Sequence, residues 1–116
     1  MYINFDYIKE FGIHGSYEGI FIIVICSKWC SSCKLFAPVL KKLKDKGFIK
    51  FIEIDIDENI NLIRRFNINA VPALLFFKNG KFLNKNIEIN GEIFVNKGVM
   101  IGSYGEQILK EIIEKI

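Results

Sequence analysis

Residues 20–38 read IFIIVICSKWCSSCKLFAP. The apolar run that opens this stretch is rich in Ile and Val, and it predicts a buried strand over residues 19–27. After it, apolar side chains recur at helical spacing, which predicts an amphipathic helix that ends at Gly47. Two cysteines, Cys30 and Cys33, therefore stand where a buried strand passes into a helix.

Helical and strand patterns alternate along the rest of the chain. Apolar residues at helical spacing occupy residues 5–11, and an alternating strand pattern over residues 48–57 leads into a short helix at residues 60–66. Residues 73–77 form a further apolar strand, and the dipeptide Asn79-Gly80 after it has the composition of a tight hairpin turn.

The C-terminal residues predict one more helix. Ser103 and Glu106 have the spacing of a capping box, a common start of helices. The apolar stripe that follows consists of Ile108, Leu109, Ile112, Ile113 and Ile116. Strands that alternate with helices, together with a late hairpin, predict an α/β fold in which helices flank both faces of a central mixed β-sheet. We expect one domain, residues 1–116.

The composition is that of a globular protein. The chain has 116 residues, of which 51% are hydrophobic and 25% charged, and this excludes a disordered segment. Its net charge of +3 is spread over interspersed Lys, Arg, Asp and Glu, so we expect no nucleic-acid partner. The longest apolar run, residues 20–26, is too short to cross a bilayer, and the N-terminus lacks the pattern of a signal peptide. We therefore expect a cytoplasmic protein without a membrane partner.

The placement of Cys30 and Cys33 indicates redox chemistry. In the first turn of a helix, unpaired backbone N–H groups and the helix dipole stabilise a thiolate over a thiol, and Cys30 is expected there. Cys33 lies one turn deeper on the buried face, so we expect it to be shielded but close to the sulfur of Cys30. In such a pair the outer thiolate attacks a target disulfide, and the inner thiol resolves the mixed disulfide. This reaction needs no bound cofactor.

Metal binding is the other use of closely spaced cysteines. A site made from Cys26, Cys30 and Cys33 would need a fourth ligand, and the only histidine, His14, lies in a glycine-flanked loop. We therefore expect no metal. Cys26 falls inside the predicted buried strand and is interpreted as a small core residue.

The sequence of residues 29–34, Trp-Cys-Ser-Ser-Cys-Lys, resembles the tryptophan-flanked active site of the thioredoxin family. Ala37-Pro38 is similar to the bent helix of that family, and residues 55–59 are similar to the end of its central strand. Val71-Pro72 and residues 77–80 are similar to the later half of the family's sequence. The resemblance implies a thioredoxin-like fold and a thiol-disulfide oxidoreductase that reduces or exchanges protein disulfides. It also implies a separate reductase as electron donor, and we expect a monomer.

The resemblance further implies roles for residues around the cysteines. The Val71-Pro72 peptide bond would be cis and face the cysteine pair, with the backbone of Val71 pairing to an extended substrate. Trp29 would form part of the contact surface for protein substrates. Gly102 resembles the glycine that lets a substrate approach on the other side of the active site.

Two residues depart from the family pattern near the expected resolving thiol. Val24 stands where the family usually keeps a buried aspartate, so no carboxylate there can take the proton of Cys33. Glu53, where the family usually has a lysine, is a candidate for this base. The alternative interpretation of Glu53 is a charged strand residue at the surface.

The residues between the cysteines are a second departure. Ser31 and Ser32 stand where the commonest family sequence is Gly-Pro, and their hydroxyls can donate hydrogen bonds to a thiolate. Lys34 is a further candidate for tuning that thiolate. Because stabilising the reduced form makes a thiol couple more oxidising, we predict a reduction potential above that of ordinary thioredoxin.

A third departure is the length of the late hairpin. About fourteen more residues separate Gly80 from Gly102 than the usual hairpin of the family holds. Residues 87–89 and 92–95 alternate on either side of Asn90-Gly91, which predicts a second tight turn in an elongated late β-hairpin. This extension is either a harmless edge feature or a surface that docks a partner. The second interpretation supports an alternative function, a thioredoxin-fold protein-binding module with weak or vestigial redox activity.

Overall fold

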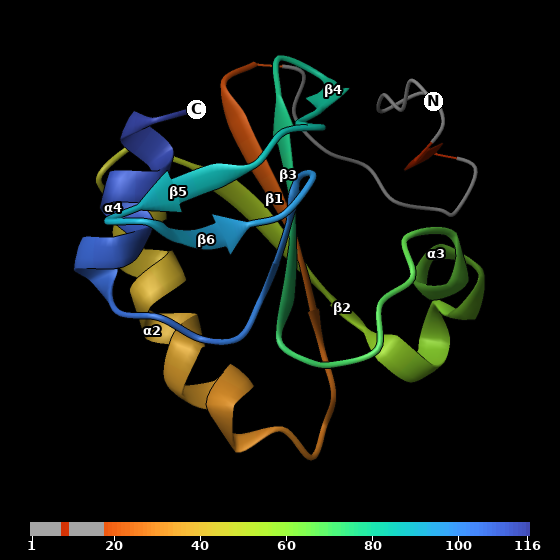
Figure 1. The fold of residues 1–116 in the computed structure, drawn as a ribbon. Coiled ribbons are helices and arrows are strands. Elements are labelled where there is room, and N and C mark those ends of the chain that lie inside the picture. The colour runs from red at the N-terminus through yellow and green to blue at the C-terminus, as the bar shows by residue number, and fades with distance from the viewer. Residues whose placement is uncertain (1–7, 10–17) are drawn as a thin grey trace.

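The computed structural model describes residues 8–9 and 18–116 and contains one central sheet and one smaller sheet (Figure 1). The strands of the central sheet are β1 (Ile20–Cys26), β2 (Lys50–Asp55), β3 (Ala73–Lys78), β4 (Lys81–Phe82) and β7 (Val99–Ile101). The smaller sheet pairs β5 (Ile87–Ile89) with β6 (Glu92–Val95). The helices are α2 (Ser31–Asp45), α3 (Ile60–Arg65) and α4 (Glu106–Glu114), with a short 3-10 helix, η1 (Ile56–Glu58).

Strand β1 lies in the middle of the central sheet, parallel to β2 and antiparallel to β3. Its side chains alternate between two cores: Ile22 and Val24 pack with α2 and α4, whereas Ile23 and Ile25 pack on the α3 side. Burial on both faces explains why this strand is a continuous apolar run. The prediction of a mixed sheet with helices on both faces is confirmed.

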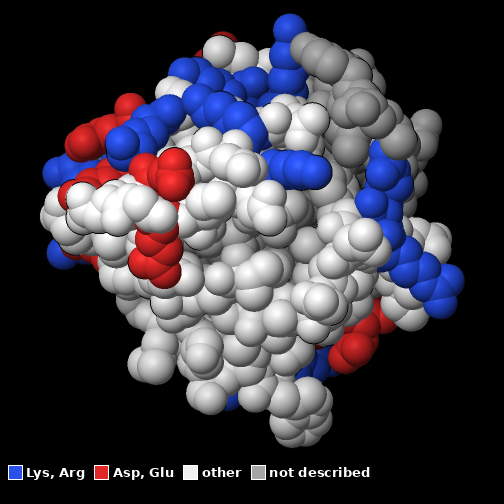
Figure 2. All heavy atoms as spheres, viewed as in Figure 1, with Lys and Arg blue, Asp and Glu red and all other residues white. Residues whose placement is uncertain are grey.

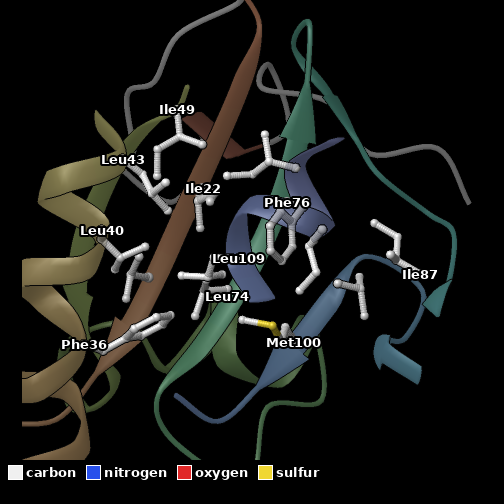
Figure 3. Packing of buried hydrophobic residues seen from close by; sticks show 14 of the residues in the cluster. Ile22, Phe36, Leu40, Leu43, Ile49, Leu74, Phe76, Ile87, Met100 and Leu109 are labelled. Carbon is white, nitrogen blue, oxygen red and sulfur yellow. The ribbon is translucent and has the colours of Figure 1, made fainter. Parts of the chain in front are cut away.

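The core on the α2 and α4 side fills the space between these helices and the sheet. Figure 3 shows Phe36, Leu40 and Leu43 of α2 directed at the sheet, which presents Ile22, Leu74 and Phe76 to them. The buried positions of α2 recur every three or four residues, as expected for an amphipathic helix. This packing fixes the N-terminal end of α2 against the end of β1.

The outer edge of β3 is shared by two short strands. Phe77 pairs with Phe82 of β4, whereas Leu75 pairs with Val99 of β7. The chain therefore leaves the sheet after Leu83 and returns at Gly98, and the residues between them interrupt what would otherwise be one returning strand. Gly98 has a φ of +84°, and a Cβ added there would lie 2.4 Å from the carbonyl oxygen of Leu83, so this junction requires glycine.

The residues inserted at this junction form a hairpin of their own. The Asn90-Gly91 turn lies between β5 and β6 as predicted, and both of its residues have positive φ. The hairpin does not lengthen the β3–β4 pair. Instead Ile87, Ile89 and Val95 are buried in the core on the α2 and α4 side, and Ile87 lies beyond Phe76 as seen from α2 (Figure 3).

The predicted capping box before the last helix is wrong. Gly105 is the N-cap of α4, and no side chain caps this helix. Glu106 lies inside the first turn, where its carboxylate pairs with Lys42 of α2 at 3.0 Å and with Lys46, the C-cap of α2, at 2.8 Å. The hydrogen bonds from Lys46 and Lys42 lower the pKa of Glu106 to about 2. The carboxylate is thus directed at the neighbouring helix and not at the backbone of Ser103.

The predicted N-terminal helix at residues 5–11 falls largely outside the described residues, as does His14. Of that helix, Ile8 is fully buried in the core on the α3 side.

Candidate active site

Three segments of the chain meet at one end of the central sheet. Ile25 of β1 pairs with Ala73 of β3, which pairs on its other side with Ile101 of β7. The residues adjoining these three positions therefore lie together at this end, and they are the loop 27–30, Pro72 and Gly102. The backbone N–H of Gly102 donates to the carbonyl oxygen of Pro72 at 2.8 Å, which ties two of these segments to each other.

Cys30 lies at the start of α2, one residue before the position expected from the sequence. It is the N-cap of this helix, and its sulfur accepts a hydrogen bond from the backbone N–H of Cys33 at 3.2 Å. The backbone N–H of Cys30 donates to the carbonyl oxygen of Ser27 at 3.2 Å, which closes the loop between β1 and α2. The side chain is half-buried, so a substrate sulfur can reach it.

Cys33 is buried beneath Cys30 in the first turn of α2, with only 5% of its surface exposed. Burial is the main reason that its pKa is raised, and its hydrogen bond to the Cys30 sulfur acts in the same direction. Two donors oppose this rise: the side chain of Cys26 and the backbone of Ser27 both hydrogen bond to the Cys33 sulfur and lower its pKa. All three cysteines are free thiols.

Cys26, the last residue of β1, is buried as predicted, and burial raises its pKa. The sequence interpretation missed its hydrogen bond to Cys33. No local sequence pattern signals this contact, because Cys26 ends β1, Cys33 lies in α2, and only the fold of the loop between these elements brings them together. Within residues 8–9 and 18–116, no three His, Cys, Asp or Glu side chains form a group that could hold a metal ion.

An open hollow of about 330 Å³ lies beside Cys33 and is lined by Cys26, Lys34, Glu53 and Asp55, among others. Glu53 pairs with Val24 across β1 and β2, which places its side chain on the same face of the sheet as α2. Glu53 is exposed and is one of the residues that line this hollow. Glu53 is therefore a charged strand residue at the surface, and its role as a base for Cys33 stays a prediction.

The residues expected to contact substrate surround the cysteines on the outer side. Trp29 is 88% exposed, an unusual position for the only tryptophan of the chain. The Val71-Pro72 peptide bond is cis, which confirms the expectation for this bond, and Pro72 is buried. Gly102 has a φ of +109°, a backbone conformation that favours glycine. Ser31, Ser32 and Lys34 are exposed on the first turn of α2, and their influence on the thiolate stays a prediction.

A family model described as Thioredoxin matches residues 11–98. The chain belongs to the thioredoxin family. It is 28% identical to the thioredoxin of Staphylococcus saprophyticus over 100 residues, which cover 84% of this chain and 83% of that protein. It is 29% identical to Thioredoxin-1 of Saccharomyces cerevisiae over 91 residues, which cover 78% of this chain and 88% of that protein.

Solved structures agree with this thioredoxin fold. A mutant thioredoxin from Halobacterium salinarum superposes with a TM-score of 0.68 at 23% identity, covering 95% of this chain and 82% of that one. Mitochondrial thioredoxin 3 from Saccharomyces cerevisiae gives a TM-score of 0.63 at 21% identity, covering 85% of this chain and 80% of that one. Thioredoxin-family membership supports thiol-disulfide oxidoreductase activity. None of the helices in the described part of the chain is long and apolar enough to span a membrane.

Proposed function

We propose that this member of the thioredoxin family reduces or exchanges protein disulfides, with Cys30 as the nucleophile and Cys33 as the resolving thiol. The observation that carries this proposal is the pair of free thiols at the start of α2, one half-buried at the N-cap and one buried a turn deeper. The hydrogen bond from the Cys33 backbone to the Cys30 sulfur supports these roles, because it holds the outer sulfur above the inner one.

The reaction transfers two electrons from the enzyme to the target. The Cys30 thiolate attacks one sulfur of the target disulfide, a mixed disulfide forms, and the other target sulfur leaves and takes up a proton. Cys33 then loses its proton and attacks the Cys30 sulfur. The second target sulfur leaves as a thiol, and Cys30 and Cys33 remain joined by a disulfide. A separate reductase, as electron donor, returns this disulfide to two thiols.

The surface around the cysteines suits a protein substrate. The β1–α2 loop lies at the lower end of the molecule in Figure 1, and on the face that Figure 2 shows, most of this lower end is uncharged, whereas Lys and Arg are more frequent toward the upper end. Trp29, Val71, Pro72 and Gly102 would form the binding surface at this end. A monomer in the cytoplasm, without membrane or nucleic-acid partners, completes the proposal.

Reduction of insulin disulfides by dithiothreitol tests the proposal, because a catalytic dithiol accelerates this reaction. We expect the wild-type chain to accelerate it and both Cys30→Ser and Cys33→Ser to abolish the acceleration. Cys33→Ser should trap a mixed disulfide through Cys30, visible by mass spectrometry, and Cys30→Ser should trap none. A folded wild-type chain that gives no acceleration would overturn the proposal and favour the protein-binding module.

A further inference from the structure

A third sulfur takes part in the hydrogen bonding of the cysteine pair. Cys26 and Cys33 belong to the same buried cluster and line the same hollow, and a hydrogen bond from the Cys26 side chain lowers the pKa of Cys33. We propose that Cys26 is a positioning residue, whose S–H group donates to the Cys33 sulfur and stabilises it as a thiolate when it resolves the mixed disulfide. This inference rests on the proposed function and adds a step to it.

The need for such a donor follows from the burial of Cys33. A sulfur with 5% of its surface exposed receives little solvation from water, so the protein must supply hydrogen bonds for the charged form. Two donors approach it from the end of β1, the backbone of Ser27 and the side chain of Cys26. In the mixed disulfide Cys30 is bonded to the target, which leaves these two donors to stabilise the attacking thiolate.

Cys26 is suited to donate and poorly suited to react. Burial raises its pKa well above the usual value, so at neutral pH it keeps its proton. A protonated thiol is a weak hydrogen-bond donor and not a nucleophile. Its position also replaces chemistry missing elsewhere, because Val24 on the same face of β1 has no polar group to act on Cys33.

The proton that Cys33 loses leaves through the hollow beside it. Charged groups face this hollow from each element around it: Lys28 from the loop, Lys34 from α2, and Glu53 and Asp55 from β2. Because these groups are unchanged by substitution of Cys26, a change in the pH dependence of resolution in a Cys26 variant reports on the Cys26 hydrogen bond.

Ellman's reagent separates the two steps of the reaction. Cys30 releases one equivalent of coloured thiolate when it attacks the reagent, and Cys33 releases a second when it resolves the mixed disulfide, so stopped-flow absorbance gives both rates. Cys33→Ser, which should lose the second phase, identifies it. We expect Cys26→Ala to slow the second phase about threefold to fivefold at pH 7, since S–H is a weak donor and a more basic thiolate recovers part of the rate. The pH profile of the second phase should shift to higher pH in this variant.

Two variants separate the hydrogen bond from packing. Cys26→Ser keeps a donor and should restore the second phase to within about twofold of wild type. Ile22→Val removes one carbon from the same face of β1 in the same core, and it should leave both phases unchanged. The first phase, which depends on Cys30 alone, should be the same in all three variants.

Three outcomes would overturn the inference. They are a second phase in Cys26→Ala equal to wild type, an equal slowing by Cys26→Ser and Cys26→Ala, and a Cys26–Cys33 disulfide found by mass spectrometry in the oxidised protein. The last would show that Cys26 reacts and does not merely donate. Failure of the proposed function is distinguishable, because the wild-type chain itself would then give no insulin reduction.

Discussion

The β1–α2 junction and the β5–β6 hairpin use their side chains in opposite ways. At the junction Trp29, Ser31 and Ser32 are exposed, and Cys33 is the buried member of the site. The hairpin places Ile87, Ile89 and Val95 in the core and contributes no cysteine. In this protein, chemistry and stability are assigned to different regions. Changes in the hairpin should alter the free energy of unfolding, and changes in the junction should alter the redox reaction.

The two regions come close at Tyr104. Its ring meets the ring of Phe94 of β6 edge-on, with centroids 5.1 Å apart. A side chain added at Gly102 would lie 3.5 Å from the same ring. Tyr104 therefore lies between the hairpin and Gly102, at the edge of the active site.

Gly98→Ala should have the largest effect on stability. The added Cβ would meet the backbone of Leu83 at the base of the hairpin, where the positive φ also disfavours alanine. We expect a loss of about 3 kcal/mol or more in the free energy of unfolding, measured by urea denaturation. Gly91→Ala is the matched control: it has a similar φ of +83° but nothing within 4 Å, so it should lose only about 1 kcal/mol. Equal losses would show that the base of the hairpin is not tightly packed.

Ile87→Ala should follow in size. Ile87 is 3% exposed, and truncating a buried isoleucine costs about 2–4 kcal/mol. Ile93 on the opposite strand is 52% exposed, so Ile93→Ala should change the free energy of unfolding by less than about 0.5 kcal/mol. Both folded variants should keep the wild-type rates with Ellman's reagent. A slower reaction of Ile87→Ala with Ellman's reagent would show that the hairpin affects the redox reaction as well as stability.

Ser31→Gly combined with Ser32→Pro should change the redox reaction with a smaller effect on stability. If the serine hydroxyls stabilise the thiolate, their loss lowers the reduction potential, by about 30 mV for each 1.4 kcal/mol. Proline is tolerated in the first turn of a helix, so α2 should be retained. Equilibration with glutathione measures the potential. An unchanged or higher potential would show that these hydroxyls do not tune Cys30.

The sequence predicted those features that depend on local patterns. Burial of β1, the helix after Cys30 and the Asn90-Gly91 turn each follow from residue order over a few positions. The division of the strand opposite β3 into β4 and β7 could not be predicted, because a two-residue strand carries no periodicity. The contact between Cys26 and Cys33 was missed for a related reason, since it depends on how the loop folds α2 onto β1. The capping box failed because α4 begins at Glu106 with Gly105 as its N-cap, so Ser103 and Glu106 do not occupy the positions that a capping box requires.

Glu106→Gln should have the smallest effect, and it tests the link between the helix that carries the cysteines and the helix beneath the hairpin. The pKa of Glu106 is lowered to about 2 by Lys46 and Lys42, so its ion pairs stabilise the folded state above the unfolded pKa of 4.5 and are lost as the pH falls toward 2. Urea denaturation between pH 6 and about pH 2 should therefore show wild type and variant converging at low pH, with a smaller difference in high salt because the pair is exposed. Glu114→Gln removes the same charge at the far end of α4 and serves as the control. Equal convergence in both variants would assign the effect to net charge and not to the contact between α2 and α4.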